Sequence, residues 1–287
     1  MPPAPTNPFE LSTADLAPLE ARARGFDFTG LVLESISTPN HPRFDAVYDL
    51  LWNEFGVAGE MEQRDVIAAR LAWPPSVAAD GLAMRYAMAV ALHDGRVAAV
   101  RDHTVIIDPA DPNRTVVVHL SHLLVTAAFR GSGLAGWMRA LPLRTVREFL
   151  TQLGLTNTPP RPVVLVAEME PADPTDAART RRLTAYERAG FSKIDSVALA
   201  YRQPDFRPFA VIDADGGPRP VPLSLVVRRV GREGEASMPG LEVRHIVEAL
   251  RAAYARTMRP ADVSVLSGDR LPLGNARVAL LHPTVLR

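Results

Sequence analysis

LLVTAAFRGSGLAGW, residues 123–137, carries more structural information than any other segment of the chain. Its first part resembles the end of an apolar strand near Val125 and its last part begins a helix, so a glycine-containing turn joins the two. Gly131 and Gly133 allow backbone conformations closed to other residues and let a ligand approach the main chain. Amide groups at a helix N-terminus, aided by the helix dipole, favour pyrophosphate binding. The segment predicts a phosphate-binding turn, to which Arg130 could add a positive charge.

Two other interpretations of this turn stay open. Gly131, Gly133 and Gly136 also spell G-x-G-x-x-G, the dinucleotide-binding pattern. That pattern requires an acidic residue at the end of the next strand, about 20 residues later. Here the interval contains a helix and then residues 151–160, TQLGLTNTPP, with no strand. Dinucleotide binding is therefore the weaker reading. The third interpretation is a strand–turn–helix junction that binds nothing.

The segments on either side predict a mixed α/β sheet. Runs 84–93 and 96–107 form the clearest hairpin, because Asp94-Gly95 between them suits a type I′ turn. Pro142 predicts a kink or an irregular turn in the helix that follows the glycine turn. The remaining predicted strands are 31–37, 114–125, 162–170, 194–203 and 222–230, and the predicted helices are 43–55, 61–73, 129–150, one ending at 186–191, and 241–258.

Composition excludes several function classes. The 287 residues include 32 basic and 32 acidic side chains, so the chain lacks the basic excess typical of proteins that bind nucleic acid or anionic membranes. It has no cysteine, which excludes disulfides, thiolate metal sites and cysteine nucleophiles. The N-terminus lacks the pattern of a secretion signal, and no apolar run approaches the ~20 residues of a membrane span. These features predict a cytoplasmic protein with neither a nucleic-acid nor a membrane partner.

Two motifs resemble the GCN5-related N-acetyltransferases, the GNAT family. Residues 130–135, Arg-Gly-Ser-Gly-Leu-Ala, match the family's acyl-CoA signature R/Q-x-x-G-x-G/A, and residues 186–191, Tyr-Glu-Arg-Ala-Gly-Phe, resemble its Y-E-x-x-G-F element. Both occur in the family's order, with a predicted strand between them. The resemblance covers residues 31–230 as an acyltransferase domain. It leaves 1–30 as an N-terminal extension and 231–287 as a C-terminal helix and tail packed on that domain.

The resemblance implies a sheet that splays open between strands 114–125 and 162–170. The pantetheine arm of acetyl-CoA, the acyl donor, would lie in the opening, and its pyrophosphate would lie on the amides of residues 130–136. The implied activity is transfer of an acetyl or short acyl group to a primary amine of a small molecule or peptide, without a metal. The implied donor-binding residues are Leu123, Leu124, Val125, Arg130, Gly131, Ser132, Gly133, Leu134, Ala135 and Gly136.

Acyl transfer to an amine needs a proton acceptor, an oxyanion donor and a proton for the leaving thiolate. By resemblance, Tyr186 is the acid for the thiolate and the main-chain N–H of Val125 is the oxyanion donor. Two candidates for the base lie on neighbouring strands. His119 precedes Val125 by six residues, and Glu168 shares a strand face with Glu170.

Two such close carboxylates could raise the pKa of one of them into a useful range. The pattern E-M-E-P at residues 168–171, also found in relatives, favours Glu168. A water molecule is a third alternative for the base. Strand alternation places His122 on the face opposite His119, which argues against a metal shared by the two histidines.

The sequence departs from the family pattern before the tyrosine. Many relatives carry an asparagine there, whereas residues 177–185 read AARTRRLTA, which weakens any detailed transfer of roles around the pantetheine. The chain beyond Tyr201 could cover the acceptor site, form a homodimer interface or simply pack on the sheet. A catalytically inactive CoA-binding sensor or interaction module is the alternative to an enzyme. The sequence does not identify the acceptor.

Overall fold

The computed structural model describes residues 7–156, 160–263, 271, 274 and 276–286. The chain divides into two compact units. The first unit comprises 1–76, 85–105 and 121–157, and the second comprises 77–84, 106–120 and 158–287. Three long strands contribute residues to both units: β2 Ala83–His93, β3 Arg96–Ile107 and β4 Val116–Val125.

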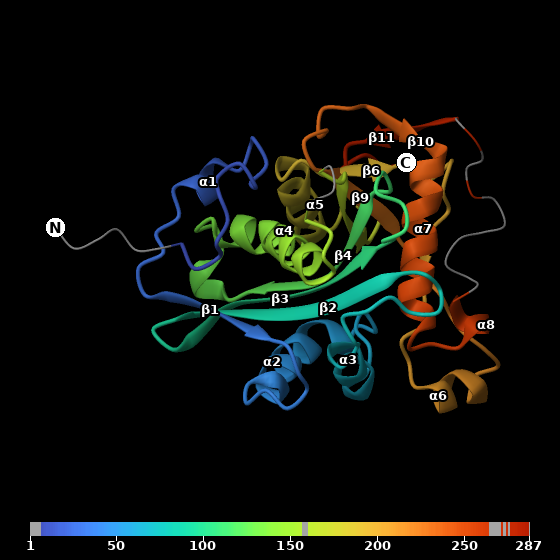
Figure 1. Ribbon diagram of the computed structural model, residues 1–287, viewed down its shortest axis with the longest axis horizontal. Helices are drawn as coiled ribbons and strands as arrows, with labels where there is room; N and C mark the ends of the chain where they lie inside the picture. Colours follow the sequence, from blue (N-terminus) through green and yellow to red (C-terminus); the bar gives the residue numbers. More distant parts are fainter. Residues whose placement is uncertain (1–6, 157–159, 264–270, 272–273, 275, 287) are drawn as a thin grey trace. The chain divides into compact units, whose positions relative to one another are not determined.

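The sheet of the first unit has the strand order β1-β2-β3-β4 (Figure 1). The strands are β1 Leu31–Ile36, β2 Ala83–His93, β3 Arg96–Ile107 and β4 Val116–Val125. Asp94 and Gly95, between β2 and β3, have φ angles of 49° and 77°. Positive φ at both central residues is what a type I′ turn requires. The predicted hairpin is therefore confirmed.

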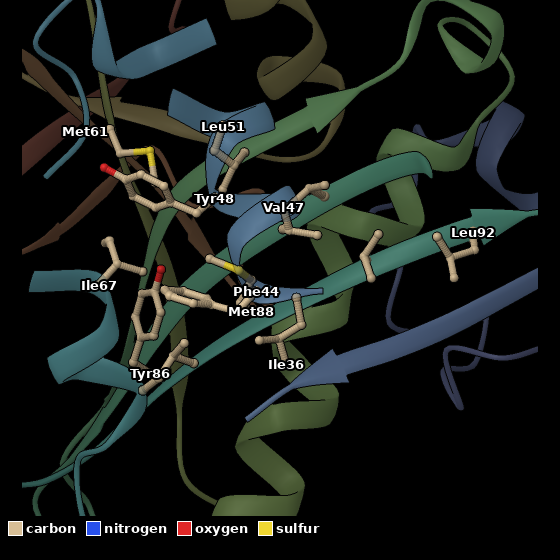
Figure 2. Packing of buried hydrophobic residues seen from close by; sticks show 13 residues of the cluster. Ile36, Phe44, Val47, Tyr48, Leu51, Met61, Ile67, Tyr86, Met88 and Leu92 are labelled. Carbon is tan, nitrogen blue, oxygen red and sulfur yellow. The ribbon is translucent and has the colours of Figure 1, made fainter. Parts of the chain in front are cut away.

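Helices cover both faces of this sheet (Figure 1). On one face lie α2 Phe44–Leu51, the π-helical turn η1 Trp52–Gly56 and α3 Arg64–Leu71, and on the other lies α4 Leu134–Gln152. Figure 2 shows how one face of α2 packs on β1 and β2. The residues of this core include Ile36, Phe44, Val47, Tyr48, Leu51, Met61, Ile67, Tyr86, Met88 and Leu92.

The irregular turn, one of the two alternatives predicted at Pro142, is wrong, because α4 is one continuous helix with Pro142 inside it. The other alternative, a kink, stays a prediction. Residues before β1 pack against this helix. Phe9 is fully buried and stacks on Trp137, with ring centroids 6.0 Å apart. The indole N–H of Trp137 donates to the carbonyl of Ala23, at 2.6 Å. From residue 7 onward, the segment that we expected as an extension contributes to the core of the first unit, and it includes the short helix α1 Ala21–Arg24.

The sheet of the second unit has the order β4-β5-β9-β6-β11-β10. The pair β4–β5 is parallel, with Val116–Leu120 opposite Val163–Ala167, and the pairs from β5 to β9, β6 to β9, β11 to β6 and β10 to β11 are antiparallel. The new strands are β5 Val163–Met169, β6 Ser192–Ile194, β9 Ser224–Arg229, β10 Ser237–Pro239 and β11 Arg277–Leu281, with a separate ribbon of β7 Arg202–Gln203 and β8 Val221–Pro222.

The helices of the second unit are α5 Ala177–Arg188, α6 Phe209–Ala214, α7 Gly240–Ala255 and α8 Pro260–Val263. The predicted strand 194–203 is wrong. Asp195 accepts the amide of Val197 through its side chain, at 3.0 Å, and its carbonyl accepts the amide of Ala198. This local turn ends β6 at Ile194. The predicted fold class, a mixed α/β sheet flanked by helices, is confirmed, and the sheet is mostly antiparallel.

Candidate functional site

The glycine turn has the geometry that the sequence predicts. After β4 ends at Val125, a short 3₁₀ turn, Ala127–Phe129, leads to Gly133, which caps the N-terminus of α4. Gly131 and Gly133 have φ angles of 80° and 106°. Side chains other than hydrogen are strained in that region, so both glycines are required by backbone conformation.

Three amides of this turn have no acceptor among the described residues: those of Gly131, Gly133 and Ala135. The amides of the residues that alternate with these three already donate to other groups of the turn. Arg130 and Ser132 donate to carbonyls of the 3₁₀ turn, Leu134 donates to the Ser132 hydroxyl, and Gly136 donates to the carbonyl of Gly133. Arg130, Gly131 and Ser132 are exposed. Of the three residues with unsatisfied amides, Gly131 is exposed, and Gly133 and Ala135 are half-buried. A helix N-terminus with unsatisfied amides is a suitable place for a phosphate group.

The segment before β1 lies directly against the turn. A Cβ atom on Gly133 would lie 2.9 Å from the main-chain nitrogen of Ala23 and closer still to the carbonyl oxygen of Arg22. A Cβ atom on Gly136 would lie 2.6 Å from the Cβ of Ala23. Gly136 therefore serves close packing of helix against segment, and its amide points into the helix. Of the predicted donor-binding residues, Gly136 and Leu134 are buried.

Arg130 and Arg22 place two guanidinium groups beside the turn. Arg130 Nε donates to the carbonyl of Val125, at 3.1 Å, and Arg22 Nη1 lies 3.5 Å from the carbonyl oxygen of Gly131. Both arginines are exposed. Leu123, Leu124 and Val125, which lead into the turn, are each half-buried. The opening that the resemblance implies beside these residues stays a prediction.

The two predicted bases, His119 and Glu168, are brought together in the second unit. His119 Nε2 lies 3.0 Å from Glu168 Oε2, because both side chains leave the same face of the parallel pair β4–β5. The hydroxyl of Tyr254 donates to the same oxygen, at 2.7 Å, and the hydroxyl of Tyr201 donates to the other. The His119 and Tyr254 rings also meet edge to face, with centroids 5.6 Å apart.

The surroundings of Glu168 correct the expectation of a raised pKa. Burial by itself raises the pKa of this carboxyl, but the hydrogen bond and charge of His119 and the hydroxyls of Tyr201 and Tyr254 hold the pKa below its usual value. Glu170 does not contribute, because it forms ion pairs with Arg179, at 2.8 Å, and with Arg182. Glu168 is thus a hydrogen-bonded anion.

Tyr186 lies on α5, where its ring packs edge to face on Phe191 with centroids 4.9 Å apart. The side chain is half-buried. The Y-E-x-x-G-F element thus ends a helix, as predicted. The sequence pattern does not reveal the two tyrosines that bind Glu168. Tyr254 belongs to the apolar stripe of α7 and Tyr201 to a segment predicted as strand, and neither position carries a pattern for a buried carboxylate partner.

Solved structures of acetyltransferases, the class that the motifs resemble, are similar to this chain. An acetyltransferase from Streptococcus agalactiae is 14% identical, with a TM-score of 0.40 over 70% of this chain and 99% of that one. The ribosomal-protein-S18-alanine N-acetyltransferase of Escherichia coli is 16% identical, with a TM-score of 0.34 over 70% and 94%. Naa50 of Arabidopsis thaliana, in complex with the bisubstrate analogue CoA-Ac-MVNAL, is 11% identical, with a TM-score of 0.39 over 69% and 98%.

At these TM-scores and identities, the likenesses establish neither the fold nor the reaction of this chain. No protein-family model matches the sequence, and no curated protein matches it. Within the described ranges, no helix is both long enough and apolar enough to cross a bilayer. The case for a function therefore depends on the motifs and on the geometry of the two units.

Proposed function

We propose that this chain is an acyl-CoA-dependent N-acyltransferase that transfers an acetyl or short acyl group to a primary amine of a small molecule or peptide. The observation that supports it is the turn after β4. Gly131 and Gly133 have the positive φ angles that the motif requires, and three amides of the turn are unsatisfied in the described structure. The order of strand, turn and helix is that of the GNAT signature.

In this proposal the turn binds the pyrophosphate of the donor. The amides of Gly131, Gly133 and Ala135 donate to phosphate oxygens, and the exposed guanidinium of Arg130 adds a charged contact. Main-chain groups of Leu123, Leu124 and Val125 pair with the pantetheine arm. The N–H of Val125 then stabilises the oxyanion that forms when the amine attacks the thioester. These contacts are proposed from the motif resemblance.

Tyr186 donates a proton to the departing sulfur in this proposal. Glu168 is a poor base, because a carboxyl with a lowered pKa binds a proton weakly at neutral pH. His119 presents Nε2 to that carboxylate and not to a substrate. We therefore propose a structural role for this pair, in which it fixes β4, β5 and α7 of the second unit to one another.

A second candidate is a CoA-binding module without catalysis. One observation favours it: both bases suggested by the sequence lie in a closed, buried cluster, with side-chain exposures of 4% for His119 and 7% for Glu168. Such a module would bind acetyl-CoA at the turn but transfer nothing.

Tyr186→Phe separates the two candidates. The substitution removes only the hydroxyl, so the aromatic contact with Phe191 remains. For an enzyme we expect kcat to fall roughly 100-fold, with the Kd of acetyl-CoA changed less than twofold, because a positioned acid contributes about 10²–10⁴-fold. The assay follows CoA release from acetyl-CoA in the presence of a panel of primary amines.

Tyr201→Phe is the control, because it removes a tyrosine hydroxyl from the Glu168 cluster and should leave kcat within about threefold at a temperature where the protein is folded. Wild-type protein that binds acetyl-CoA but acylates no amine would support the module. Full activity of Tyr186→Phe would contradict the role of Tyr186.

A further inference from the structure

A second buried carboxylate–histidine pair lies in the first unit. His122 Nδ1 is 3.0 Å from Asp102 Oδ2, and the main-chain N–H of His122 donates to Asp102 Oδ1 at 2.7 Å. The hydroxyl of Tyr86 donates to Oδ2, at 2.6 Å. Asp102 is 0% exposed and His122 5%. Tyr86 extends this chain into the apolar core drawn in Figure 2.

The other ring nitrogen of His122 has an acceptor as its partner. Nε2 lies 3.1 Å from the carbonyl oxygen of Glu60, and the ring of Phe55 covers the imidazole, with centroids 5.0 Å apart. A carboxylate and a carbonyl both only accept hydrogen bonds. Only the imidazolium, which has an N–H on each nitrogen, satisfies both partners. These contacts therefore favour the protonated form of His122.

The charged groups around His122 favour this form. Burial alone lowers the pKa of His122, but Asp102, and after it the Glu62 carboxylate and the Glu60 carbonyl, raise it to about 9. Glu62 is itself ion-paired with Arg70 of α3, and Tyr86 faces Asp102 from β2. These groups lie on β2, β3 and α3 and in the connection between η1 and α3.

Loss of the proton would both create a base and uncover it. A neutral His122 keeps Nδ1–H on the Asp102 carboxylate and turns a lone pair on Nε2 toward the Glu60 carbonyl, and two acceptors repel each other. The Glu60 carbonyl belongs to a short connection after η1 in which Val57, Ala58 and Gly59 are exposed. Withdrawal of the carbonyl requires a local rearrangement of this connection, in which the main-chain N–H of Glu60 donates to the carbonyl of Phe55, at 3.0 Å. Nε2 would then be free to accept a proton from another molecule.

The position of His122 on β4 suits the proposed reaction. It precedes Val125 by three residues, roughly 10 Å of extended strand, whereas His119 precedes it by six, roughly 20 Å. Measured along the strand, and leaving aside that the His122 and Val125 side chains leave opposite faces, the first distance equals about an imidazole side chain and one water molecule. The second requires a chain of waters. His122 also lies in the same compact unit as Val125 and the glycine turn.

We propose that His122 is the general base for the acceptor amine, with Asp102 and Tyr86 as its positioning residues and the Glu60 carbonyl as a cover over its protonated form. This inference rests on the proposed acyltransferase function. Neutral Nε2 takes a proton from the amine nitrogen as the C–N bond forms. The C–S bond then breaks, its electron pair leaves with sulfur, and the Tyr186 hydroxyl protonates the thiolate. Solvent carries the proton from the imidazolium back to the tyrosine, so that amine and thioester give amide and thiol.

The test is the pH dependence of kcat, measured for the full chain with saturating acetyl-CoA and the most active amine of a panel of spermidine, tyramine and a short peptide. The wild-type rate should rise with pH to a midpoint near 9, because only neutral His122 accepts a proton. Asp102→Asn should lower the midpoint by at least one pH unit. Tyr86→Phe, a milder change, should move it upward, since Asp102 loses a competing donor. The titration of the amine itself would not respond to either substitution.

His122→Gln should abolish the rise of kcat with pH and lower kcat on the order of 100-fold. The Kd of acetyl-CoA should stay within twofold of wild type. The control is His282→Gln, a histidine whose side chain is 75% exposed. Should the variants fail to fold, NMR titration of the histidine side chains of the wild-type protein replaces them as the test. A His122 that is neutral at pH 7 overturns the inference. Unchanged profiles, or acetyl-CoA binding without turnover on any amine, also overturn it. Failure of the wild type to bind acetyl-CoA would instead refute the proposed function itself.

Discussion

Gly133→Ala is expected to lower the free energy of unfolding by roughly 4 kcal/mol, the sum of a left-handed backbone strain of about 1–3 kcal/mol and an overpacking cost of similar size. The backbone at Gly133 has a φ of 106°, and an added Cβ would overlap main-chain atoms of Arg22 and Ala23. The alanine therefore pushes residues 20–24 away from α4. Urea unfolding measures the loss, and faster tryptic cleavage after Arg22 or Arg24 in the native protein reports the released segment.

Gly154→Ala is the matched control, since Gly154 has a φ of 71° but no atom within 4 Å of an added Cβ. Gly154→Ala therefore introduces the backbone strain of a positive φ without a steric clash. We expect it to lower the free energy of unfolding by about 1 kcal/mol, because reduced freedom of the unfolded chain offsets part of the strain. If both variants lost the same stability, the close packing of residues 20–24 on the turn would be wrong.

Asp102→Ala is expected to cost about 3–5 kcal/mol at pH 6, because it leaves the buried charge of His122 without its partner. Burial raises the pKa of Asp102, but His122 and Tyr86 more than reverse that effect and hold it far below its usual value. Asp45→Ala, which breaks an exposed pair with Arg64, is the control and should change stability by at most about 1 kcal/mol.

The stability that Asp102→Ala loses should be larger at low pH than at high pH. The pKa of His122 is raised in the folded protein, from 6.5 to about 9, so its contribution is complete below pH 6.5 and disappears as pH rises through 9. Asp102 has a lowered pKa, so its contribution disappears only in acid. Unfolding of wild type and Asp102→Ala at pH 6 and pH 9.5 should therefore show a smaller difference at the higher pH. An equal or larger difference at pH 9.5 would contradict a charged His122.

The sequence predicted the parts of the fold that depend on local backbone chemistry. The Asp94-Gly95 hairpin, the strand before Val125 and the helix after Gly133 follow from residues that few other conformations accommodate. Pro142 does not end the helix, because it is buried inside α4, which continues to Gln152. The packing of the segment before β1 in the first unit has no counterpart in the sequence pattern. The segment's proline-rich start resembles a tail, but Phe9 stacks on a tryptophan far along the chain.

The side-chain clusters could be predicted only in part. Strand alternation placed His119 and His122 on opposite faces of β4, and each has its own carboxylate, Glu168 and Asp102. Neither pairing is visible in the sequence, since the partners come from neighbouring strands whose register is set by the whole sheet. A pair of carboxylates on one strand, Glu168 and Glu170, suggested a coupled site, but arginines on α5 hold the second one apart.

Calorimetric titration of the full chain with acetyl-CoA tests the central claim most directly, with Ser132→Glu beside Ser132→Gln. Ser132 is exposed, and both substitutions remove the hydroxyl that accepts the Leu134 amide, so the two variants differ only in charge. Micromolar binding to the wild type is expected, with the glutamine variant within about fivefold. The glutamate variant should bind on the order of 100-fold more weakly, because a carboxylate a few ångströms from a pyrophosphate repels it. Absence of binding, or equal binding by the two variants, would contradict an acyl-CoA site at this turn.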